Sequence, residues 1–525
     1  MRIGIDVGGT HTDAVVLDAQ DVIASTKVLT SENVKDGVVN ALDEVLSASQ
    51  VEHSTIDAVM IGTTQFTNAV IERRELAPTA IIRIALPSGE LVPPMIDWPE
   101  DIAKELGRNV YMIHGGRTYD GFPIAPLEDA EIDRAIDDMA VKAIELVAIS
   151  GVFSPSDPAQ EEYVAARVKQ RLPGARVTQS HNIGRMGLLE RENAALLNAS
   201  LLPLADRVVQ SFASALQERQ IDCPFYVSQN DGTLMSAGFA AEFPALTFAS
   251  GPTNSLRGAS LLTNLDDAVV VDIGGTTSDI GVLQDGFPRQ SNIAIEVGGV
   301  RTNFRMPDIQ SIGLGGGSLV VDDGQTIGPR SVGYRLVTDG LVFGGDTLTA
   351  TDIVVAAGTA DIGDAGKVAD LDANLVDTAI AKIHAIIDNG IDQMKSSRDP
   401  VPVVLVGGGA ILVSKSLVTA SRIHRPEHSG VANAIGAANA QVGSETERIV
   451  SYRRVPREQV LAEMREILEI RLVEAGADPA TVKLADIEET SISYMADEST
   501  RIRVKMVGDL SFNKSLNKRG GTQCR

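Results

Sequence analysis

The sequence has few of the residues that build disulfide-rich, membrane-spanning or nucleic-acid-binding proteins. Its 525 residues include 2 cysteines, Cys223 and Cys524, too few for a disulfide framework or a cysteine-rich metal cluster. No apolar run approaches the roughly 20 residues of a membrane-spanning helix. Basic residues number 46 against 70 acidic ones, and the net charge of −24 opposes general binding to nucleic acid or to an anionic membrane.

Other residue patterns are absent as well, and their absence excludes further kinds of metal site and catalytic site. None of the 7 histidines stands in a metal-ligand spacing such as H-x-x-x-H, so we expect no structural zinc. The chain also lacks a Ser-His-Asp-like or Cys-His signature of nucleophilic catalysis. Aromatic residues make up only 4% whereas glycine occurs 48 times, a balance that suits an α/β protein with many tight turns. No signal peptide is visible after Met1, and with so few cysteines we expect a cytoplasmic protein.

Two similar stretches open the two halves of the chain. They are residues 2–18, RIGIDVGGTHTDAVVLD, and residues 269–285, VVVDIGGTTSDIGVLQD. Each joins a β-branched strand, a D-x-G-G-T turn and a second apolar strand, which predicts a β-hairpin. The duplication predicts a pseudo-symmetric pair of domains with the phosphates of a nucleotide between them.

The turns of these hairpins have the chemistry of a phosphate site. Glycines free backbone N–H groups to line a nest for anions, and threonine hydroxyls add donors. The leading aspartates, Asp6 and Asp272, end buried strands and are candidates to hold Mg²⁺ directly or through water. With Asp13 and Asp279 they form the candidate catalytic carboxylates. The candidate nucleotide-binding residues of the hairpins are Gly8, Gly9, Thr10, Thr12, Gly274, Gly275, Thr276 and Thr277.

Three further stretches are candidate ligand loops. Gly407, Gly408 and Gly409 follow an expected strand at 401–406 and open an expected helix, where glycines would let an adenine ring approach the backbone. The G-T-T-x-x-T-N run from residue 62 predicts a helix start, either aimed at a ligand or simply capped by threonine. The triple glycine in SIGLGGGS fits a ligand loop and a structural turn equally well. The candidate substrate contacts in the last two stretches are Thr63, Thr64, Asn68, Gly315, Gly316, Gly317 and Ser318.

The order of the expected elements predicts an α/β fold with three parts. Expected strands at 2–7, 13–18 and 21–29, followed by alternating helices and strands, are typical of a ribonuclease-H-like half of the actin-like ATPase fold. We therefore expect two such lobes, at 1–180 and 181–442, and a small C-terminal α+β appendage at 443–525. A long helix near 191–217 is expected to carry the crossover between the lobes, and the tail at 513–525 is expected to fray.

Eight motifs along residues 2–442 occur in the order typical of one protein family. They are IGIDVGGTHTD (3–13), IGTTQFTNAVIER (61–73), ASGPTNSLRGA (249–259), VVDIGGTTSDI (270–280), SIGLGGGS (311–318), LTATDIVVAAG (348–358), VGGGA (406–410) and VANAIGAANA (431–440). Taken together, they resemble the hydantoinase A / 5-oxoprolinase family of the acetate-kinase, sugar-kinase, Hsp70 and actin superfamily. The resemblance implies an ATP-dependent hydrolase that phosphorylates the amide oxygen of a cyclic amide, such as a hydantoin, 5-oxoproline or another lactam, and a hydantoinase B-like second subunit that completes ring opening. Because relatives also take part in acetone carboxylation, a related carbonyl compound is an alternative substrate.

Two other classes of function stay open at this point. A small-molecule kinase of the same superfamily would phosphorylate a hydroxyl group and would need an aspartate base, for which Asp13 or Asp279 are candidates. An actin-like ATPase switch would use the same nucleotide cleft without small-molecule chemistry. Stable phosphorylated product would favour the first alternative, and filament formation with ATP would favour the second.

Overall fold

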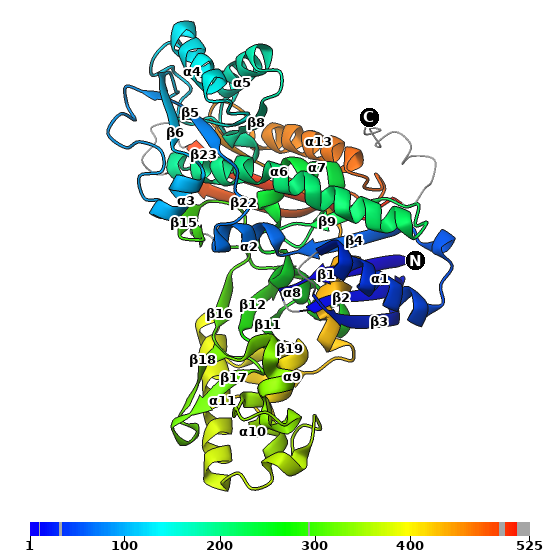
Figure 1. Ribbon diagram of the computed structural model, residues 1–525. Helices are drawn as coiled ribbons and strands as arrows, with labels where there is room; N and C mark the ends of the chain where they lie inside the picture. Colours follow the sequence, from blue (N-terminus) through cyan, green and yellow to red (C-terminus); the bar gives the residue numbers. More distant parts are fainter. Residues whose placement is uncertain (10, 31–33, 292–293, 493–498, 512–525) are drawn as a thin grey trace.

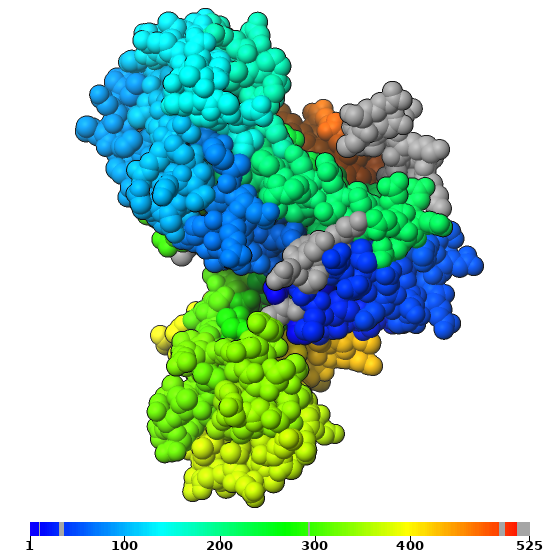
Figure 2. All heavy atoms as spheres, in the orientation of Figure 1, coloured from blue at the N-terminus to red at the C-terminus, as the bar shows by residue number. Residues whose placement is uncertain are grey.

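A computed structural model describes residues 1–9, 11–30, 34–291, 294–492 and 499–511. Figure 1 shows a large upper body and a smaller lower lobe, and in the space-filling view the two meet at a narrower waist (Figure 2). Within the described part, no helix is long and apolar enough to cross a membrane. Thr10, the expected frayed tail and Cys524 lie outside the described residues.

The largest sheet has nine strands and begins with the first predicted hairpin. β1 pairs antiparallel with β2 and parallel with β4. β1 is almost wholly buried because helices cover both faces: Val16 of the neighbouring β2 packs in a core with α1 (Val34–Ser49), and Val15 packs against α12 (Ala432–Ala438). The strands, in spatial order, are β22 (Lys483–Ser491), β23 (Ser499–Gly508), β21 (Val442–Ser451), β10 (Leu234–Ser236), β9 (Phe225–Ser228), β4 (Ala58–Thr63), β1 (Arg2–Val7), β2 (His11–Asp18) and β3 (Asp21–Leu29).

The lower lobe repeats the central part of this sheet. β12 and β11 form the second hairpin, and β11 pairs parallel with β19, as β1 pairs with β4. The order β13-β12-β11-β19-β20 matches β3-β2-β1-β4-β9 strand for strand, which confirms two ribonuclease-H-like lobes. The strands of this sheet are β13 (Phe287–Pro288), β12 (Ser278–Gln284), β11 (Ala268–Ile273), β19 (Val401–Val406), β20 (Ala420–His424) and β16 (Ile309–Ile312), which also pairs with β12.

Two helices cross between the lobes, and neither is the one that the sequence suggested. α8 (Ser250–Thr263) follows the strands of the first lobe but packs on β11, β12 and β19 of the second. α12 follows the strands of the second lobe and packs on β1, β2 and β4 of the first. The long α6 (Leu188–Glu218), expected to carry the crossover, packs instead within the upper body against α1, β5, β7 and β8.

Glycines allow α8 and α12 to pack closely. A Cβ atom on Gly258 would lie 1.9 Å from the carbonyl oxygen of Ala432, and a Cβ on Gly436 would lie 1.9 Å from that of Asn254. Both distances are far below a permissible contact, so only glycine fits at either position. The close contact fixes α8 at the junction of the two lobes, where it also approaches β4.

Strand pairing crosses the boundaries expected from the sequence. β9 and β10 fall after residue 180 but belong to the sheet of the first lobe, and the sheet of the second lobe starts at β11. The C-terminal region is α+β, as expected, and it extends the same nine-stranded sheet through β21, β23 and β22. Its helix α13 (Arg457–Glu474) shares a core with residues of β4 and β9, so this region is joined to the upper body by a continuous core.

A separate parallel sheet of four strands completes the upper body. Its central strands β5 and β7 pair with each other, and α4 and α5 pack beside them. The stretch between β5 and α4 contains the short α3 and β6. These elements are β6 (Asn109–His114), β5 (Thr79–Leu86), β7 (Leu146–Gly151), β8 (Arg176–Gln179), α3 (Glu100–Glu105), α4 (Asp129–Val141) and α5 (Ala159–Arg171).

The remaining elements connect these layers or cover the lower lobe. The longest of them, α11, packs its apolar face on β12, β16 and β18. They are α2 (Gln65–Glu72), α7 (Ala237–Glu242), α9 (Leu336–Asp339), α10 (Ala350–Ala356), α11 (Ala373–Met394), β14 (Ile295–Val297), β15 (Val300–Thr302), β17 (Ser318–Val321) and β18 (Thr326–Ser331).

Candidate functional site

The two hairpin turns have the same local geometry. The N–H of Gly8 donates to the carbonyl of His11 at 3.0 Å, and the N–H of Gly274 donates to the carbonyl of Thr277 at 2.9 Å. Gly9 and Gly275 are exposed in their turns, so their backbone N–H groups are placed where a phosphate can reach them. The matching turns support the prediction that the hairpins form two halves of one site.

Residues around each turn divide into exposed and supporting groups. Thr276 and Thr277 are exposed at the tip of the second turn. Thr12 is fully buried, and its hydroxyl lies 3.2 Å from that of Thr30, which in turn donates to the carbonyl of Gly8. Thr12 therefore supports the first turn from its buried side. Its contact with a nucleotide stays a prediction.

The aspartates that end β1 and β11 are held by two consecutive residues of α8. Asn254 donates from Nδ2 to Oδ1 of Asp6 at 3.2 Å, and Ser255 donates from Oγ to Oδ2 of Asp272 at 2.5 Å. Asn433 of α12 donates to the other oxygen of Asp6 at 2.9 Å. The crossing helices thus bring the carboxylates of both lobes to one place.

Burial disfavours the ionised form of both carboxylates. It raises the pKa of Asp6 from its ordinary value of 3.8 to about 6, against the hydrogen bonds from Asn254 and Asn433. Burial likewise raises the pKa of Asp272 to about 6, against the hydrogen bond from Ser255, and the nearby charges of Asp279 and Asp6 add to the rise. Helix α8 therefore contacts two carboxylates whose ionised forms are both disfavoured by burial.

The donor set fits a hard divalent cation such as Mg²⁺. Asp6 and Asp272 supply carboxylate oxygens, and Oδ1 of the buried Asn254 has no hydrogen-bond partner among the described residues. That part of the chain contains no group of three or more His, Cys, Asp or Glu side chains able to hold a metal. Mg²⁺ usually binds to one or two carboxylates and keeps water and phosphate oxygens as its other ligands. Asp6 and Asp272 would hold such an ion.

The other two candidate carboxylates lie directly across each hairpin. Asp13 stands opposite Asp6, and Asp279 stands opposite Asp272. Asp13 is buried and accepts two hydrogen bonds from Nζ of Lys27, at 2.5 and 2.8 Å. Asp279 accepts from Oγ of Ser311 at 2.5 Å, and burial raises the pKa of its carboxyl. The two positions match in place but have partners of different charge.

The SIGLGGGS loop lies beneath the second hairpin. The N–H groups of Gly316 and Gly317 donate to the carbonyls of Gly274 and Gly275, at 3.0 and 2.7 Å. Gly315 and Ser318 are buried too, and the Ser318 hydroxyl accepts from the Gly315 N–H. The loop therefore supports the turn, and the predicted contact of these four residues with a substrate stays a prediction.

The VGGGA loop packs against the same hairpin from another side. A Cβ on Gly407 would lie 2.3 Å from Oδ1 of Asp272, and a Cβ on Gly409 would lie 2.9 Å from the carbonyl of Gly274. Gly408 is exposed, and a Cβ there would meet no heavy atom within 4 Å. The loop opens a short 3₁₀ helix rather than the expected α-helix. The open side of Gly408 is where an adenine ring can approach.

The G-T-T-x-x-T-N run places the start of α2 beside the first hairpin. The N–H and hydroxyl of Thr64 both donate to the carbonyl of Val7, at 3.3 and 3.2 Å. Thr63 is buried and shares hydrogen bonds with Ser250 at the start of α8. Asn68 reaches back to the Thr64 hydroxyl at 3.5 Å. These contacts join α2 to the lobe junction, and a role of the three residues in substrate binding stays a prediction.

Five residues that contact the candidate carboxylates were not singled out from the sequence: Lys27, Asn254, Ser255, Ser311 and Asn433. Asn254 and Ser255 occur inside the ASGPTNSLRGA motif, and Asn433 occurs inside VANAIGAANA. The available signal was a polar residue within a run of small residues. A closely packed helix usually buries small apolar side chains, so a polar side chain at such a position indicates a specific hydrogen-bond partner. Lys27 gave no such signal, since a lysine on an exposed strand is ordinary.

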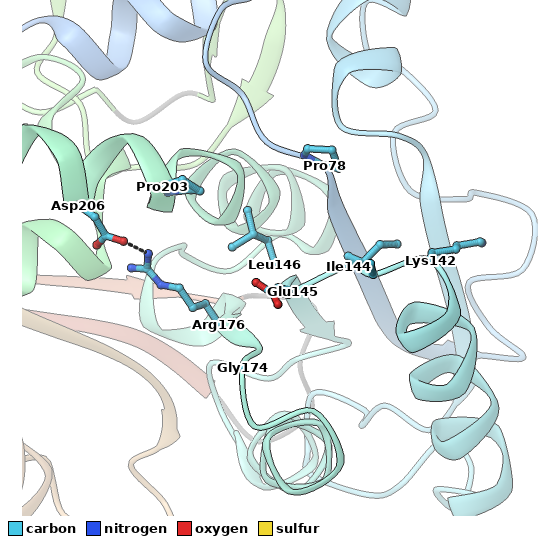
Figure 3. Close-up of a pocket in the computed structure, with 10 residues that line it drawn as sticks. Pro78, Lys142, Ile144, Glu145, Leu146, Gly174, Arg176, Pro203 and Asp206 are labelled. Carbon is cyan, nitrogen blue, oxygen red and sulfur yellow. Dashed lines mark hydrogen bonds and ion pairs between the residues drawn. The ribbon is translucent and has the colours of Figure 1, made fainter.

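A surface cavity elsewhere in the upper body has different surroundings (Figure 3). Its volume is about 450 Å³, and the ion pair between Arg176 and Asp206 lies on one side of it. Leu146 and Arg176 begin β7 and β8, so the cavity lies at the amino ends of parallel strands. Ligands of such sheets bind at the carboxyl ends, and the cavity carries no part of the candidate site. It is lined by Pro78, Lys142, Ala143, Ile144, Glu145, Leu146, Gly174, Arg176, Pro203 and Asp206.

Comparison with known families agrees with the duplicated architecture. Residues 2–172 match the hydantoinase/oxoprolinase N-terminal region, and residues 191–394 match the hydantoinase/oxoprolinase domain. The chain belongs to the hydantoinase/oxoprolinase family. The first match contains the first hairpin, and the second contains α8, the second hairpin and the loop beneath it. The family resemblance expected from the motifs is thereby confirmed.

Curated relatives in this family include subunits of enzymes. The caprolactamase alpha subunit of Pseudomonas jessenii is 26% identical over 387 residues, which cover 68% of this chain and 54% of that protein. The acetophenone carboxylase gamma subunit of Aromatoleum aromaticum is 24% identical over 389 residues, covering 68% and 53%. An uncharacterized protein of Methanocaldococcus jannaschii is 26% identical over 426 residues, covering 75% and 62%. The chain therefore spans little more than half the length of the curated relatives that it matches.

Solved structures of the family share the fold. The crystal structure of the ATP-dependent caprolactamase from Pseudomonas jessenii aligns with a TM-score of 0.77 at 19% identity, covering 97% of this chain and 88% of that one. A nucleotide-free structure of acetone carboxylase aligns with a TM-score of 0.66 at 17% identity and the same coverage. At such low identity these matches establish the architecture.

Proposed function

We propose that this chain binds ATP between its two lobes and uses it to phosphorylate the carbonyl oxygen of a cyclic amide, such as a hydantoin, 5-oxoproline or another lactam. The observation that carries the proposal is the pair Asn254 and Ser255, which hold the aspartates of the two hairpins from one helix. One helix thus contacts both carboxylates, and each carboxylate stands beside a turn whose second glycine, Gly9 or Gly275, is exposed. This is the arrangement expected for a polyphosphate and its Mg²⁺.

The chemistry needs positioning and charge neutralisation more than a nucleophile on the protein. An amide is a poor electrophile because resonance occupies its carbonyl, and transfer of the γ-phosphoryl group to oxygen gives an activated imidate. Water can then add to the carbon, and departure of the ring nitrogen leaves an acyl phosphate. A second water attacks the acyl carbon, so that inorganic phosphate leaves with the original amide oxygen. Phosphoryl transfer depends mainly on orientation and electrostatic stabilisation. Mg²⁺, when bound, would neutralise phosphate charge.

The carbonyl acceptor also suits the state of the carboxylates beside the hairpins. A carbonyl oxygen carries no proton, so the transfer requires no general base. Asp13 is buried and paired with Lys27, which makes it a poor base for a kinase reaction at a hydroxyl group. Asp279 has no charged partner among its described contacts and is the better candidate base if the kinase alternative is correct.

We further propose that a second, hydantoinase B-like subunit completes the hydrolysis. Two named relatives are themselves subunits of larger enzymes, one called caprolactamase alpha and the other acetophenone carboxylase gamma. A labile phosphorylated intermediate would be handed to the partner, and its removal would draw the first step forward. The isolated chain is then expected to show weak ATP hydrolysis and little ring opening.

The test is an ATPase screen of the purified chain against cyclic amides, with and without a candidate second subunit. The proposal predicts that one amide raises ADP release, and that the partner raises ADP release and ring opening together. Stoichiometric ring opening by this chain alone would contradict the division of labour. A stable phosphate ester of a hydroxyl compound would instead support the kinase alternative.

A further inference from the structure

Three directly opposed residues form a row across the first hairpin and its neighbouring strand. Asp6 on β1 stands opposite Asp13 on β2, and Asp13 stands opposite Lys27 on β3. Residues opposed in this way project from the same face of a sheet. Lys27 reaches along that face, and its Nζ lies 2.5 and 2.8 Å from the two carboxylate oxygens of Asp13.

The second lobe repeats this row with one difference. Asp272 on β11 stands opposite Asp279 on β12, and Asp279 stands opposite Ser311 on β16. Ser311 donates from Oγ to Oδ1 of Asp279 at 2.5 Å. The pseudo-equivalent of Lys27 is therefore a neutral serine. Because a serine satisfies the aspartate of the second lobe, an aspartate at this position of the fold does not require a cation.

Lys27 lies on the face of the first sheet that meets the two crossing helices. That face carries Asp6, whose carboxylate accepts hydrogen bonds from Asn254 of α8 and Asn433 of α12. The row of opposed residues therefore places the ammonium group on the side of the sheet that faces the lobe junction. Figure 1 shows the hairpin of β1 and β2, with β3 beside it, next to α8 and the lower lobe. The side chain of Lys27 is 38% exposed whereas that of Asp13 is 3% exposed. A ligand entering between the hairpins can therefore reach the Lys27 side chain but not its partner.

We propose that Lys27 binds the terminal phosphate of ATP and stabilises the charge of the phosphoryl group during transfer; this inference rests on the proposed binding of ATP between the hairpins. An ammonium group on a flexible four-carbon stem suits a phosphate because it can bond to several oxygens in turn. Asp13 holds the side chain in place beforehand. Because the second lobe has a neutral serine at the equivalent position, the cation indicates that the transferred phosphate lies on the side of the first lobe.

The chain itself supplies the variant that separates this role from a structural one. Lys27→Ser copies the arrangement of Asp279 and Ser311 onto the first lobe, leaving a hydrogen-bond donor near Asp13 but no charge. Lys27→Arg keeps the charge and a donor to Asp13. Lys104→Ser, at an exposed position of α3 in the upper body, is the matched control because it removes one positive charge far from the hairpins.

Calorimetry with ADP and with the non-hydrolysable analogue AMPPNP measures the effect on the terminal phosphate alone. Lys27→Ser is expected to weaken AMPPNP binding by about 10-fold or more while changing ADP binding by less than about 3-fold, and to lower ATP turnover by roughly 10²-fold, as for loss of one preorganised donor. Lys27→Arg is expected to keep the preference for AMPPNP. Lys104→Ser is expected to behave like the unmodified chain.

Each other outcome has a defined meaning. Equal loss of ADP and AMPPNP binding, or no loss of either in a folded Lys27→Ser protein, would overturn the assignment while leaving ATP binding intact. If Lys27→Ser does not fold, Lys27→Gln is measured in its place with the same expected selectivity. Failure of the unmodified chain to bind either nucleotide would overturn the proposed function itself, and with it this inference.

Discussion

Asn433 lies 427 positions from Asp6 in the sequence, yet its Nδ2 donates to Oδ2 of that aspartate at 2.9 Å. Asn433 belongs to α12, the helix that follows the strands of the second lobe and packs on the sheet of the first. The carboxylate at the first hairpin is therefore positioned by the end of the other lobe. A movement of one lobe relative to the other would change this contact, which couples the site to the lobe arrangement.

The first prediction concerns the charge of Asp272. Asp272→Asn keeps an oxygen near Ser255 but removes a charge from the place where Mg²⁺ and phosphates are proposed to meet. ATP turnover should fall by roughly 10²-fold or more, the scale for losing a preorganised charge partner. The matched control is Asp308→Asn, at a carboxylate paired with Arg289 on the surface of the lower lobe. If Asp272→Asn turned over ATP at nearly the rate of the control, the result would contradict the assignment of Asp272 to the Mg²⁺ site.

The second prediction concerns pH. Asp6 and Asp272 have pKa values of about 6 in the folded chain against an ordinary 3.8, so between these values the folded state binds more protons than the unfolded state. The free energy of unfolding contributed by these groups therefore falls as pH rises through this window, and stays low above about 6. Urea unfolding at pH 5 and pH 7.5 should show Asp272→Asn gaining stability relative to the unmodified chain at the higher pH. An unchanged difference at the two pH values would contradict the shift.

The same carboxylates should give the opposite trend for nucleotide binding. A cation needs ionised carboxylates, so binding of ATP with Mg²⁺ should strengthen as pH rises through about 6. Stability without ligand and affinity for ligand thus move in opposite directions over one pH range. Burial of the two aspartates at the lobe junction is the common cause.

The third prediction compares two adjacent glycines. Gly408→Val puts a branched side chain into open space where the adenine is expected, so the protein should fold and bind ATP about 10-fold more weakly, equal to about 1.4 kcal/mol. Gly407→Val instead meets Oδ1 of Asp272 and needs a φ of 81° that valine rarely adopts. It should lower the melting temperature. Calorimetry showing unchanged ATP affinity for a folded Gly408→Val chain would remove the adenine role.

The fourth prediction concerns the contact between the crossing helices. Gly258→Ala drives a methyl group into the carbonyl of Ala432, at a distance of 1.9 Å before any relaxation, and should cost about 1–3 kcal/mol or more of stability. Gly238→Ala is the control, because that glycine is exposed in α7 with no heavy atom within 4 Å of the added carbon. It should gain about 0.5–1 kcal/mol from helix propensity. Equal effects in chemical denaturation would show that the helices do not pack as described.

Regular elements of the first hairpin region could be predicted because their sequence signals are local. The strands at 2–7 and 21–29 have the predicted bounds. The duplication of the D-x-G-G-T turn was visible as repeated letters, and it indicated two lobes before any strand was paired. Hydrophobic pattern and turn residues are enough to predict an element that packs against its neighbours in sequence.

The parts that escaped prediction depend on contacts between distant segments. The small residues of VANAIGAANA continue to residue 440, but α12 ends at Ala438 because Val442 begins a strand that pairs with β23. Nothing local marks α8 rather than α6 as the crossover, since that depends on which sheet each helix covers. Asn254 and Ser255 contact the two aspartates only because the hairpins of both lobes pack near the same turn of α8.

The central claim is that the two hairpins together transfer phosphate to a substrate carbonyl oxygen, and isotope transfer tests it most directly. The cyclic amide that stimulates ATP hydrolysis is labelled with ¹⁸O in its carbonyl group and turned over by the chain with its second subunit in unlabelled water. The account predicts that one ¹⁸O atom appears in each inorganic phosphate released, because that oxygen bridges carbon and phosphorus in the intermediate. Unlabelled phosphate, with all the ¹⁸O kept in the ring-opened product, would contradict it.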